Sequence, residues 1–311
     1  MNKREAMFRV LDGTLPEGYT PAAFFLHFDP EYHRGKPAVD KHLEYFRYTD
    51  MDFVKIQYEH KFPVIEGIKR PEDWAKLPVY DRNFFAVPLE VVKGLVESAK
   101  AEALIIVTLY SPFMCAGHAS AEGLITEHLR QDPEAVKPAL EAATASLLNF
   151  VRGCIDLGVD GFYTSTQGGE AHRFADRNIF EQYIKPTDLV LMEEINRRCD
   201  FNILHVCDYH DSYDDLALFL DYPGHVVNCS QRIGGVDVSM AELARLFDRP
   251  FMGGMDRHGV IAQGNEAEIL VETQRVLDAA PSRFILGADC TVPSDTSWTG
   301  IRTAIGRAHG E

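Results

Sequence analysis

LIIVTLY, residues 104–110, and GFYTST, residues 161–166, are two short apolar runs separated by one long helical pattern. Runs of this length and apolarity are typical of strands buried on both faces of a parallel sheet. The pattern between them begins at Asp132, a good N-cap, and Pro133 suits the first helical position. Apolar residues then recur at spacings of three and four until Gly158, which can end a helix. This stretch therefore predicts two parallel strands joined by a helix.

The same alternation of strand and helix continues along the chain. A further helical pattern covers residues 265–281, and another covers about 179–198, where Pro186 predicts a kink. The apolar runs with the character of strands are 23–28, 53–58, 104–110, 161–166, 201–207, 226–230, 250–255 and 283–289. Eight such units predict an α/β fold, a single (β/α)8 barrel over residues 1–311, with a doubly wound sheet as the alternative. The first 20 residues are expected to form a helix and a loop outside the barrel.

Composition limits the class of protein. The chain has 311 residues, of which 46% are hydrophobic and 25% charged, so it can bury a sizeable core. A net charge of −16 argues against nucleic acid or a membrane surface as the main partner, although a local pocket can oppose that sign. There is no apolar run of membrane-spanning length, and the N-terminus lacks the character of a signal peptide. We therefore expect a cytoplasmic protein with reduced cysteines, either a monomer or a homodimer.

Polar residues gather where the predicted strands end. Active sites of (β/α)8 barrels lie at the C-terminal ends of their strands, and a purely structural rim would not need a polar residue on nearly every strand. We predict that one mouth is surrounded by His27, His118, Tyr163, His205, Cys207, Asp256 and Cys290.

Three of these residues suit a metal. FNILHVCDYHD, residues 201–211, places His205 and Cys207 on one face of a strand, because side chains alternate along it. A buried cysteine beside a hydrogen-bonded histidine is the structural alternative. Cys290 follows the last predicted strand, and the strand ends of a barrel converge, so the three side chains can meet. Two thiolates and one imidazole leave a position open on tetrahedral zinc, as in catalytic sites, so we predict one zinc ion per chain.

Four segments resemble the uroporphyrinogen decarboxylase superfamily, whose members share a (β/α)8 barrel. They are SPFMCAGH (111–118), GVDGFYTSTQGGE (158–170), GGMDRHGVIAQGN (253–265) and FILGADCTVPSDTSWTGIRTAI (284–305). One branch of this superfamily decarboxylates the acetate arms of uroporphyrinogen, in porphyrin biosynthesis, without a cofactor. The other consists of zinc-dependent methyltransferases, which pass a methyl group from a methylated corrinoid protein to a thiol such as coenzyme M.

The chain is more similar to the methyltransferase branch. That branch binds zinc through His-x-Cys and a distant Cys, a pattern that His205, Cys207 and Cys290 match. Decarboxylases have a Tyr near the position of His118, and two arginines in an N-terminal segment that here reads FFLHFDPEYHRG, with Arg34 alone. Arginine is the residue suited to bidentate binding of carboxylates, so the loss disfavours an octacarboxylate substrate. The resemblance therefore implies methyl transfer to a thiol, with a corrinoid protein as a possible partner.

Other interpretations stay open. In a uroporphyrinogen decarboxylase, Tyr163, Ser165 and Asp256 would line the cavity, with His118 in place of the Tyr; these four are the candidate catalytic residues. In a third interpretation, the barrel binds a tetrapyrrole, a corrinoid or a partner protein without turnover. In the zinc enzyme, a neighbouring carboxylate, Asp208 or Asp289, is a candidate for orienting the metal ligands.

Overall fold

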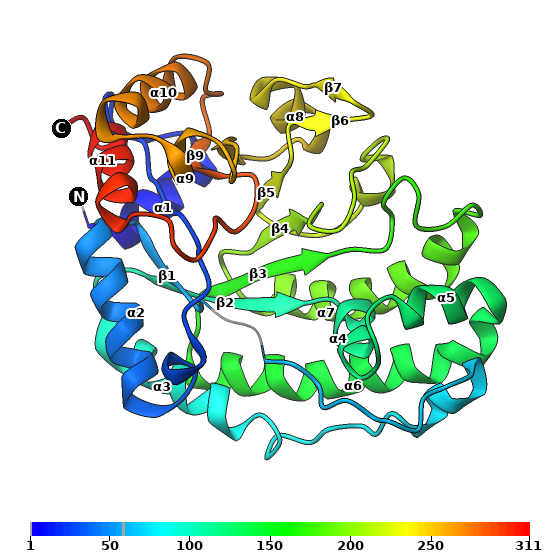
Figure 1. Cartoon of the computed structure of the whole chain (residues 1–311). Helices are drawn as coiled ribbons and strands as arrows, with labels where there is room; N and C mark the ends of the chain where they lie inside the picture. The colour runs from blue at the N-terminus through cyan, green and yellow to red at the C-terminus, as the bar shows by residue number, and fades with distance from the viewer. Residues whose placement is uncertain (1, 58–59) are drawn as a thin grey trace.

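Seven parallel strands form a curled sheet in the centre of the molecule, in the order β1-β2-β3-β4-β5-β8-β9 (Figure 1). The computed structural model describes residues 2–57 and 60–311. The strands are β1 (Phe53–Lys55), β2 (Leu104–Tyr110), β3 (Gly161–Thr166), β4 (Ile203–Val206), β5 (Val226–Cys229), β8 (Phe251–Met255) and β9 (Phe284–Ala288). These seven strands match seven of the eight predicted strands. Position 58, the last residue of the predicted strand 53–58, lies outside the described residues. Two short strands, β6 (Arg232–Ile233) and β7 (Val236–Asp237), pair separately as an antiparallel hairpin.

The remaining predicted strand, residues 23–28, is the first in chain order. It is extended but is not a regular member of the sheet. Near its start, Ala23 N donates to Leu286 O of β9 at 2.9 Å. At its end, Phe28 N donates to Gln57 O, just beyond β1, at 3.0 Å. The segment thus closes the curled sheet between β9 and β1, since Ala22 O also accepts from Asp52 N and Phe25 O from Val292 N, but only one isolated bridge, Ala22–Leu286, is formed among the described residues. The (β/α)8 barrel is confirmed, with an irregular first member.

Helices cover the outside of the sheet, and in the described part of the chain no helix is both long and apolar enough to cross a membrane (Figure 1). The helices are α1 (Lys3–Asp12), α2 (Gly35–Thr49), α3 (Ala86–Ala99), α4 (Pro112–His118), α5 (Leu124–Gln131), α6 (Pro133–Leu157), α7 (Lys185–Arg198), α8 (Met240–Phe247), α9 (Val260–Gln263), α10 (Glu266–Asp278) and α11 (Trp298–Ala308). The buried apolar side chains of sheet and helices form one contiguous core, to which α1 contributes Met7 and Val10.

The longest helix begins and ends where the sequence predicts. The Asp132 side chain accepts a hydrogen bond from Ala135 N at 3.1 Å, which satisfies one of the free amides in the first turn of α6. Gly158 ends α6 with a φ of 93°, a left-handed conformation that glycine adopts without strain. The predicted kink near Pro186 takes the form of a π-helical turn, Phe180–Ile184, directly before α7. Proline has no N–H to donate in the regular pattern, so helix geometry changes close to it.

Helix α1 lies at the N-terminal ends of the strands. Arg4 Nη2 donates to Asp160 Oδ1 at 2.6 Å, just before β3. The ring of Phe8 meets that of Phe201 edge-on, with 6.3 Å between centroids, just before β4. Since this end of the barrel is covered by a helix, the opposite end is left for a site.

Candidate metal centre and its cavity

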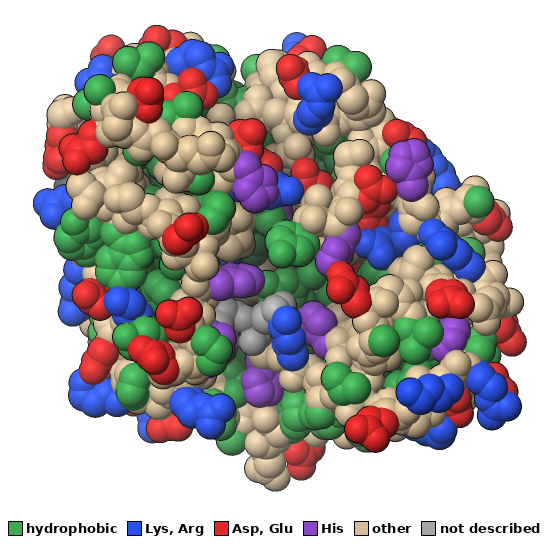
Figure 2. Space-filling model, viewed as in Figure 1, with side chains coloured by type: hydrophobic (Ala, Val, Ile, Leu, Met, Phe, Trp, Pro, Cys, Tyr) green, Lys and Arg blue, Asp and Glu red, His purple; other side chains and the backbone are tan. Residues whose placement is uncertain are grey.

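A cavity of about 880 Å³ opens at the C-terminal ends of the strands. Figure 2 shows several histidine side chains gathered around the hollow in the middle of this face. Strand residues form its floor, and the segments that follow β2, β4, β8 and β9 form much of its wall. The sequence-predicted residues that line it are His27, His118, Tyr163, Ser165, His205, Cys207 and Cys290.

Asp256 is placed differently from the other candidates. It follows β8 at the same rim, but its side chain is exposed and is not part of the cavity lining. Asp256 Oδ1 accepts a hydrogen bond from His258 N at 2.8 Å, so the carboxylate stabilises the turn after the strand. Gly253 and Gly254 have φ values of 149° and 101°, so the regular alternation of side chains does not continue to Asp256.

His205, Cys207 and Cys290 lie together on the cavity floor. Their ligand atoms are all within 4.8 Å of one another, and Cys290 Sγ is 3.3 Å from His205 Nε2. All three side chains are buried. Donor atoms around a tetrahedral zinc with Zn–S bonds of about 2.3 Å stand about 3.8 Å apart, so small side-chain movements would complete such a site. The chemistry and spacing of these donors therefore fit zinc.

Hydrogen bonds around the two sulfurs favour a thiolate at Cys207. The Cys290 thiol, His205 and the backbone N–H of Tyr209 interact with the Cys207 sulfur and lower its pKa, although burial opposes them. Gln167 Nε2 also donates to Cys207 Sγ at 3.4 Å. The same contact with Cys207, together with burial, raises the pKa of Cys290. A metal cation would remove this asymmetry, because coordination deprotonates both thiols.

The imidazole of His205 is held by an aromatic neighbour. Its ring stacks on Tyr163, with 4.9 Å between centroids and 28° between planes. The Tyr163 hydroxyl donates to Asn228 Oδ1 at 2.6 Å, and Asn228 Nδ2 donates to Met252 O and Ala288 O at 2.9 and 3.0 Å. Because its hydroxyl is bonded inside the barrel and burial raises its pKa, Tyr163 is better placed to orient His205 than to transfer protons.

Arg257, which lies two residues beyond β8, was not among the residues predicted from the sequence. Arg257 Nη1 donates to Asp208 Oδ1 and to Asp289 Oδ2, both at 2.7 Å. The two aspartates considered for orienting the metal ligands are therefore bonded to this arginine, and His205 Nδ1 has no hydrogen-bond partner among the described residues. A signal was present in the sequence, because each predicted cysteine ligand has an aspartate as its immediate neighbour, in Cys207-Asp208 and in Asp289-Cys290.

Lys55 was also not recognised as a site residue. Its side chain is 3% exposed and lines the cavity at the end of β1. The ammonium lies over the rings of Phe25 and Tyr163, 4.3 and 4.8 Å from their centroids. Burial lowers the pKa of Lys55 to about 7. A buried lysine in a cavity, with its pKa lowered in this way, is a candidate functional residue.

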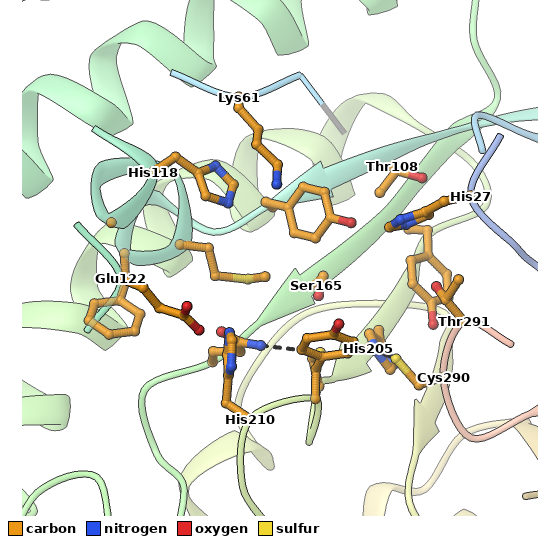
Figure 3. Close-up of a pocket in the computed structure, with 18 of the residues that line it drawn as sticks. His27, Lys61, Thr108, His118, Glu122, Ser165, His205, His210, Cys290 and Thr291 are labelled. Carbon is orange, nitrogen blue, oxygen red and sulfur yellow. Dashed lines mark hydrogen bonds between the residues drawn. The ribbon is translucent and has the colours of Figure 1, made fainter. Parts of the chain in front are cut away.

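The described lining of the cavity contains more basic than acidic side chains. Lys55, Lys61, Arg173 and Arg257 line it, whereas Glu122 is the one carboxylate among the described lining residues. Figure 3 shows Lys61 and His118 on one wall, across the cavity from His205 and Cys290. His118 is the last residue of α4, and Ser165 lies in β3 beside His205 of β4. The two arginines are paired with Glu170, Asp208 and Asp289, so much of the positive charge of the lining is already balanced by neighbouring carboxylates.

The structure is similar to three solved enzymes, each with 13% sequence identity. A methyltransferase from Methanosarcina mazei superimposes with a TM-score of 0.78, over 99% of this chain and 98% of that chain. A B12-independent methionine synthase from Shewanella sp. W3-18-1 superimposes with a TM-score of 0.60, over 94% of this chain and 96% of that chain. A protein from Listeria monocytogenes described as a putative B12-independent methionine synthase superimposes with a TM-score of 0.57, over 93% of this chain and 98% of that chain. At such low identity these similarities show a common fold.

Sequence comparison identifies the family. No curated protein sequence matches the chain. The family model for uroporphyrinogen decarboxylase (URO-D), in contrast, matches residues 51–310. This range contains every strand of the sheet together with His205, Cys207 and Cys290. The resemblance seen in the sequence is thus confirmed, and the chain belongs to the uroporphyrinogen decarboxylase family.

Proposed function

We propose that the chain is a zinc-dependent methyltransferase that moves a methyl group between a corrinoid, or a similar carrier, and a thiol. The observation that carries this proposal is the donor set on the cavity floor, one imidazole and two cysteine sulfurs within 4.8 Å of one another. Three protein donors lining an open cavity are typical of catalytic zinc, which keeps one position for water or substrate. Similarity in fold to proteins described as a methyltransferase and a methionine synthase supports the same reaction class.

The residues around the donor set suit this chemistry. Zinc held by His205, Cys207 and Cys290 would lower the pKa of a substrate thiol and keep it as the nucleophilic thiolate. Tyr163 fixes the imidazole by stacking, and Gln167 donates to the sulfur of Cys207. In the transfer, the substrate sulfur forms a bond to the methyl carbon, the electron pair of the broken bond stays on the carrier, and the thiol proton leaves to solvent.

Uroporphyrinogen decarboxylation is the second candidate, favoured by the basic lining of the cavity. A substrate with eight carboxylates needs several cations that are free to bind them. Arg34 is exposed and does not line the cavity. Arg173 lines it, but Arg173 Nε donates to the buried Glu170 carboxylate at 2.5 Å. Arg257 is bonded to Asp208 and Asp289. The arginines of the cavity are thus already paired, which supports the smaller thiol substrate.

Zinc content tests the proposal directly. Protein expressed with added zinc should carry about one zinc per chain by elemental analysis, and Cys207→Ala and Cys290→Ala should each lose it. Cys199→Ala is the matched control, because Cys199 is also buried but lies outside the donor group. Wild-type protein with less than about a tenth of an equivalent, or Cys290→Ala with full zinc, would refute the metal site.

Activity separates the two candidate reactions. The zinc-loaded protein should methylate a small thiol when supplied with methylcobalamin, followed by the loss of the cobalt–methyl absorbance. The same preparation should leave uroporphyrinogen unchanged. Decarboxylation of uroporphyrinogen at about 1 per second or faster, a rate typical of enzymes, would reverse the order of the candidates.

A further inference from the structure

The two cysteines of the candidate metal centre come from strands that are not neighbours. Cys207 follows β4, and Cys290 follows β9. In the sheet, β5 and β8 lie between these two strands. Backbone pairing fixes each strand only against its immediate neighbours, so it does not fix the separation of two segments beyond the ends of β4 and β9. Cys207 N donates to Thr166 O at 3.0 Å and Asp289 N donates to Met255 O at 2.9 Å, so each segment is held to one neighbouring strand, and a direct link between the two segments requires a contact above the sheet.

Arg257 makes such a contact. A single nitrogen, Nη1, donates to Asp208 Oδ1 and Asp289 Oδ2, both at 2.7 Å. The backbone N–H of Arg257 donates to the other oxygen of Asp289, also at 2.7 Å. Asp208 is covalently next to Cys207, and Asp289 is next to Cys290. The arginine therefore connects the two cysteine-bearing segments from a third segment, which follows β8.

The three charged side chains are mostly shielded from solvent, with exposed fractions of 12% for Arg257, 14% for Asp208 and 17% for Asp289. Ion pairs this far removed from water are screened less than surface pairs, so their geometry is held more strongly. Without the guanidinium, two largely shielded carboxylates would face each other with no cation between them. Their repulsion would move the segments apart, and the attached cysteines would move with them.

We propose that Arg257 is a positioning residue: it holds Cys207 and Cys290 at the separation that one metal ion requires, by bonding to the aspartate beside each of them. Arg257 acts through Asp208 and Asp289 and needs no contact with the metal itself. This inference rests on the proposed zinc site, and it adds the residue that orders two of its ligands.

The test compares Arg257→Gln and Arg257→Lys with the wild type. Glutamine removes the charge that the two aspartates share, whereas lysine keeps a cation of similar length. Zinc affinity is measured by competition with a chromophoric chelator, after circular dichroism has shown that each variant is folded. Replacing residues that orient metal ligands commonly costs about 10–100-fold in affinity, and we expect a loss in this range for Arg257→Gln. Arg257→Lys should recover much of it.

Arg177→Gln is the matched control. Arg177 Nη1 donates to Asp215 Oδ2 at 2.8 Å, in an exposed pair whose residues do not line the cavity. Its zinc affinity should equal that of the wild type. If Arg257→Gln is folded and binds zinc within about twofold of the wild type, the positioning role is wrong, while the zinc site itself stands.

A metal-free measurement keeps the two proposals distinguishable. Phenylarsine oxide bonds to two thiols at once and releases water, so its rate of reaction reports how closely two thiols are held. Cys207→Ala provides the background from the other cysteines. After subtraction, the wild type should react several-fold faster than Arg257→Gln, even if no zinc binds and the proposed function fails. Equal rates in these two proteins would overturn the positioning role.

Discussion

Asp188 is a buried carboxyl group whose protonation should control stability above pH 4. It lies in the first turn of α7, with no exposed surface. Thr166 Oγ1 and the Tyr222 hydroxyl donate to its Oδ2 at 2.6 and 3.0 Å, and Oδ1 has no partner among the described residues. Burial raises the pKa of Asp188 to about 7 despite those two bonds, because desolvation disfavours the charged form. The folded protein therefore holds a proton that the unfolded chain releases near pH 4.

The direction of the pH effect follows from proton binding. Between about pH 4 and pH 7 the folded state binds more protons at Asp188 than the unfolded state does, so the free energy of unfolding falls as pH rises. Well below the folded-state pKa each pH unit costs about 1.4 kcal/mol, and at pH 7 about half of that, so stability should fall by about 2 kcal/mol from pH 5 to pH 7. At pH 7 half of the folded-state carboxyl is still protonated, so the decline should slow there and stop near about pH 8.

Asp188→Asn has the same shape and cannot ionise, so it isolates this contribution. Urea unfolding at several pH values between 5 and 8, with a chelator present, gives the free energy of unfolding of both proteins. The difference in free energy of unfolding between wild type and variant should change by about 3 kcal/mol between pH 5 and pH 8, and the variant should be favoured at high pH. If the free energies of unfolding of the two proteins differ by the same amount, within about 0.5 kcal/mol, at every pH, Asp188 is not protonated in the folded protein at these pH values.

Two further substitutions test the framework of the site by thermal or urea unfolding. Gly161→Ala should prevent stable folding or cost more than about 3 kcal/mol, because a Cβ at Gly161 would lie 1.5 Å from Phe201 O; a loss below about 1 kcal/mol would contradict this contact. Asn228→Ala should cost about 3 kcal/mol, since it removes three buried hydrogen bonds, including the one from Tyr163. In a zinc-loaded protein it should also weaken metal binding through the freed Tyr163 ring, and unchanged zinc affinity would show that the stacking on His205 does not depend on Asn228.

The parts of the fold that the sequence predicts best are those with strong local signals. The runs 104–110 and 161–166 coincide with β2 and β3 because continuous burial needs continuous apolar sequence. The start and end of α6 follow from Asp132 and Gly158, which act within one helical turn. Segment 23–28 carries the same apolar signal, but a strand also needs a partner along its length, and that is not encoded locally.

The candidate site is predictable only in part, for a similar reason. His205 and Cys207 stand out because alternation along an extended segment places them on one face, and a barrel implies that Cys290 can join them. Arg257 is 49 residues from Asp208 and 32 from Asp289, so its two ion pairs depend on the folded chain. The direction of the Tyr163 hydroxyl, toward Asn228, depends in the same way on neighbours that are distant in sequence.

The irregular closure of the barrel by residues 23–28 affects how the cavity can diversify. In a regular ladder, a shift of one residue turns every side chain to the opposite face, so insertions and deletions are strongly disfavoured. This segment bonds to both neighbours through residues 21–25 and again at Phe28, so a change in its length is absorbed most easily between Phe25 and Phe28. His27, near its end, faces the cavity. Evolution can therefore remodel this wall, and with it the choice of substrate, while the register of the other seven strands is inherited unchanged.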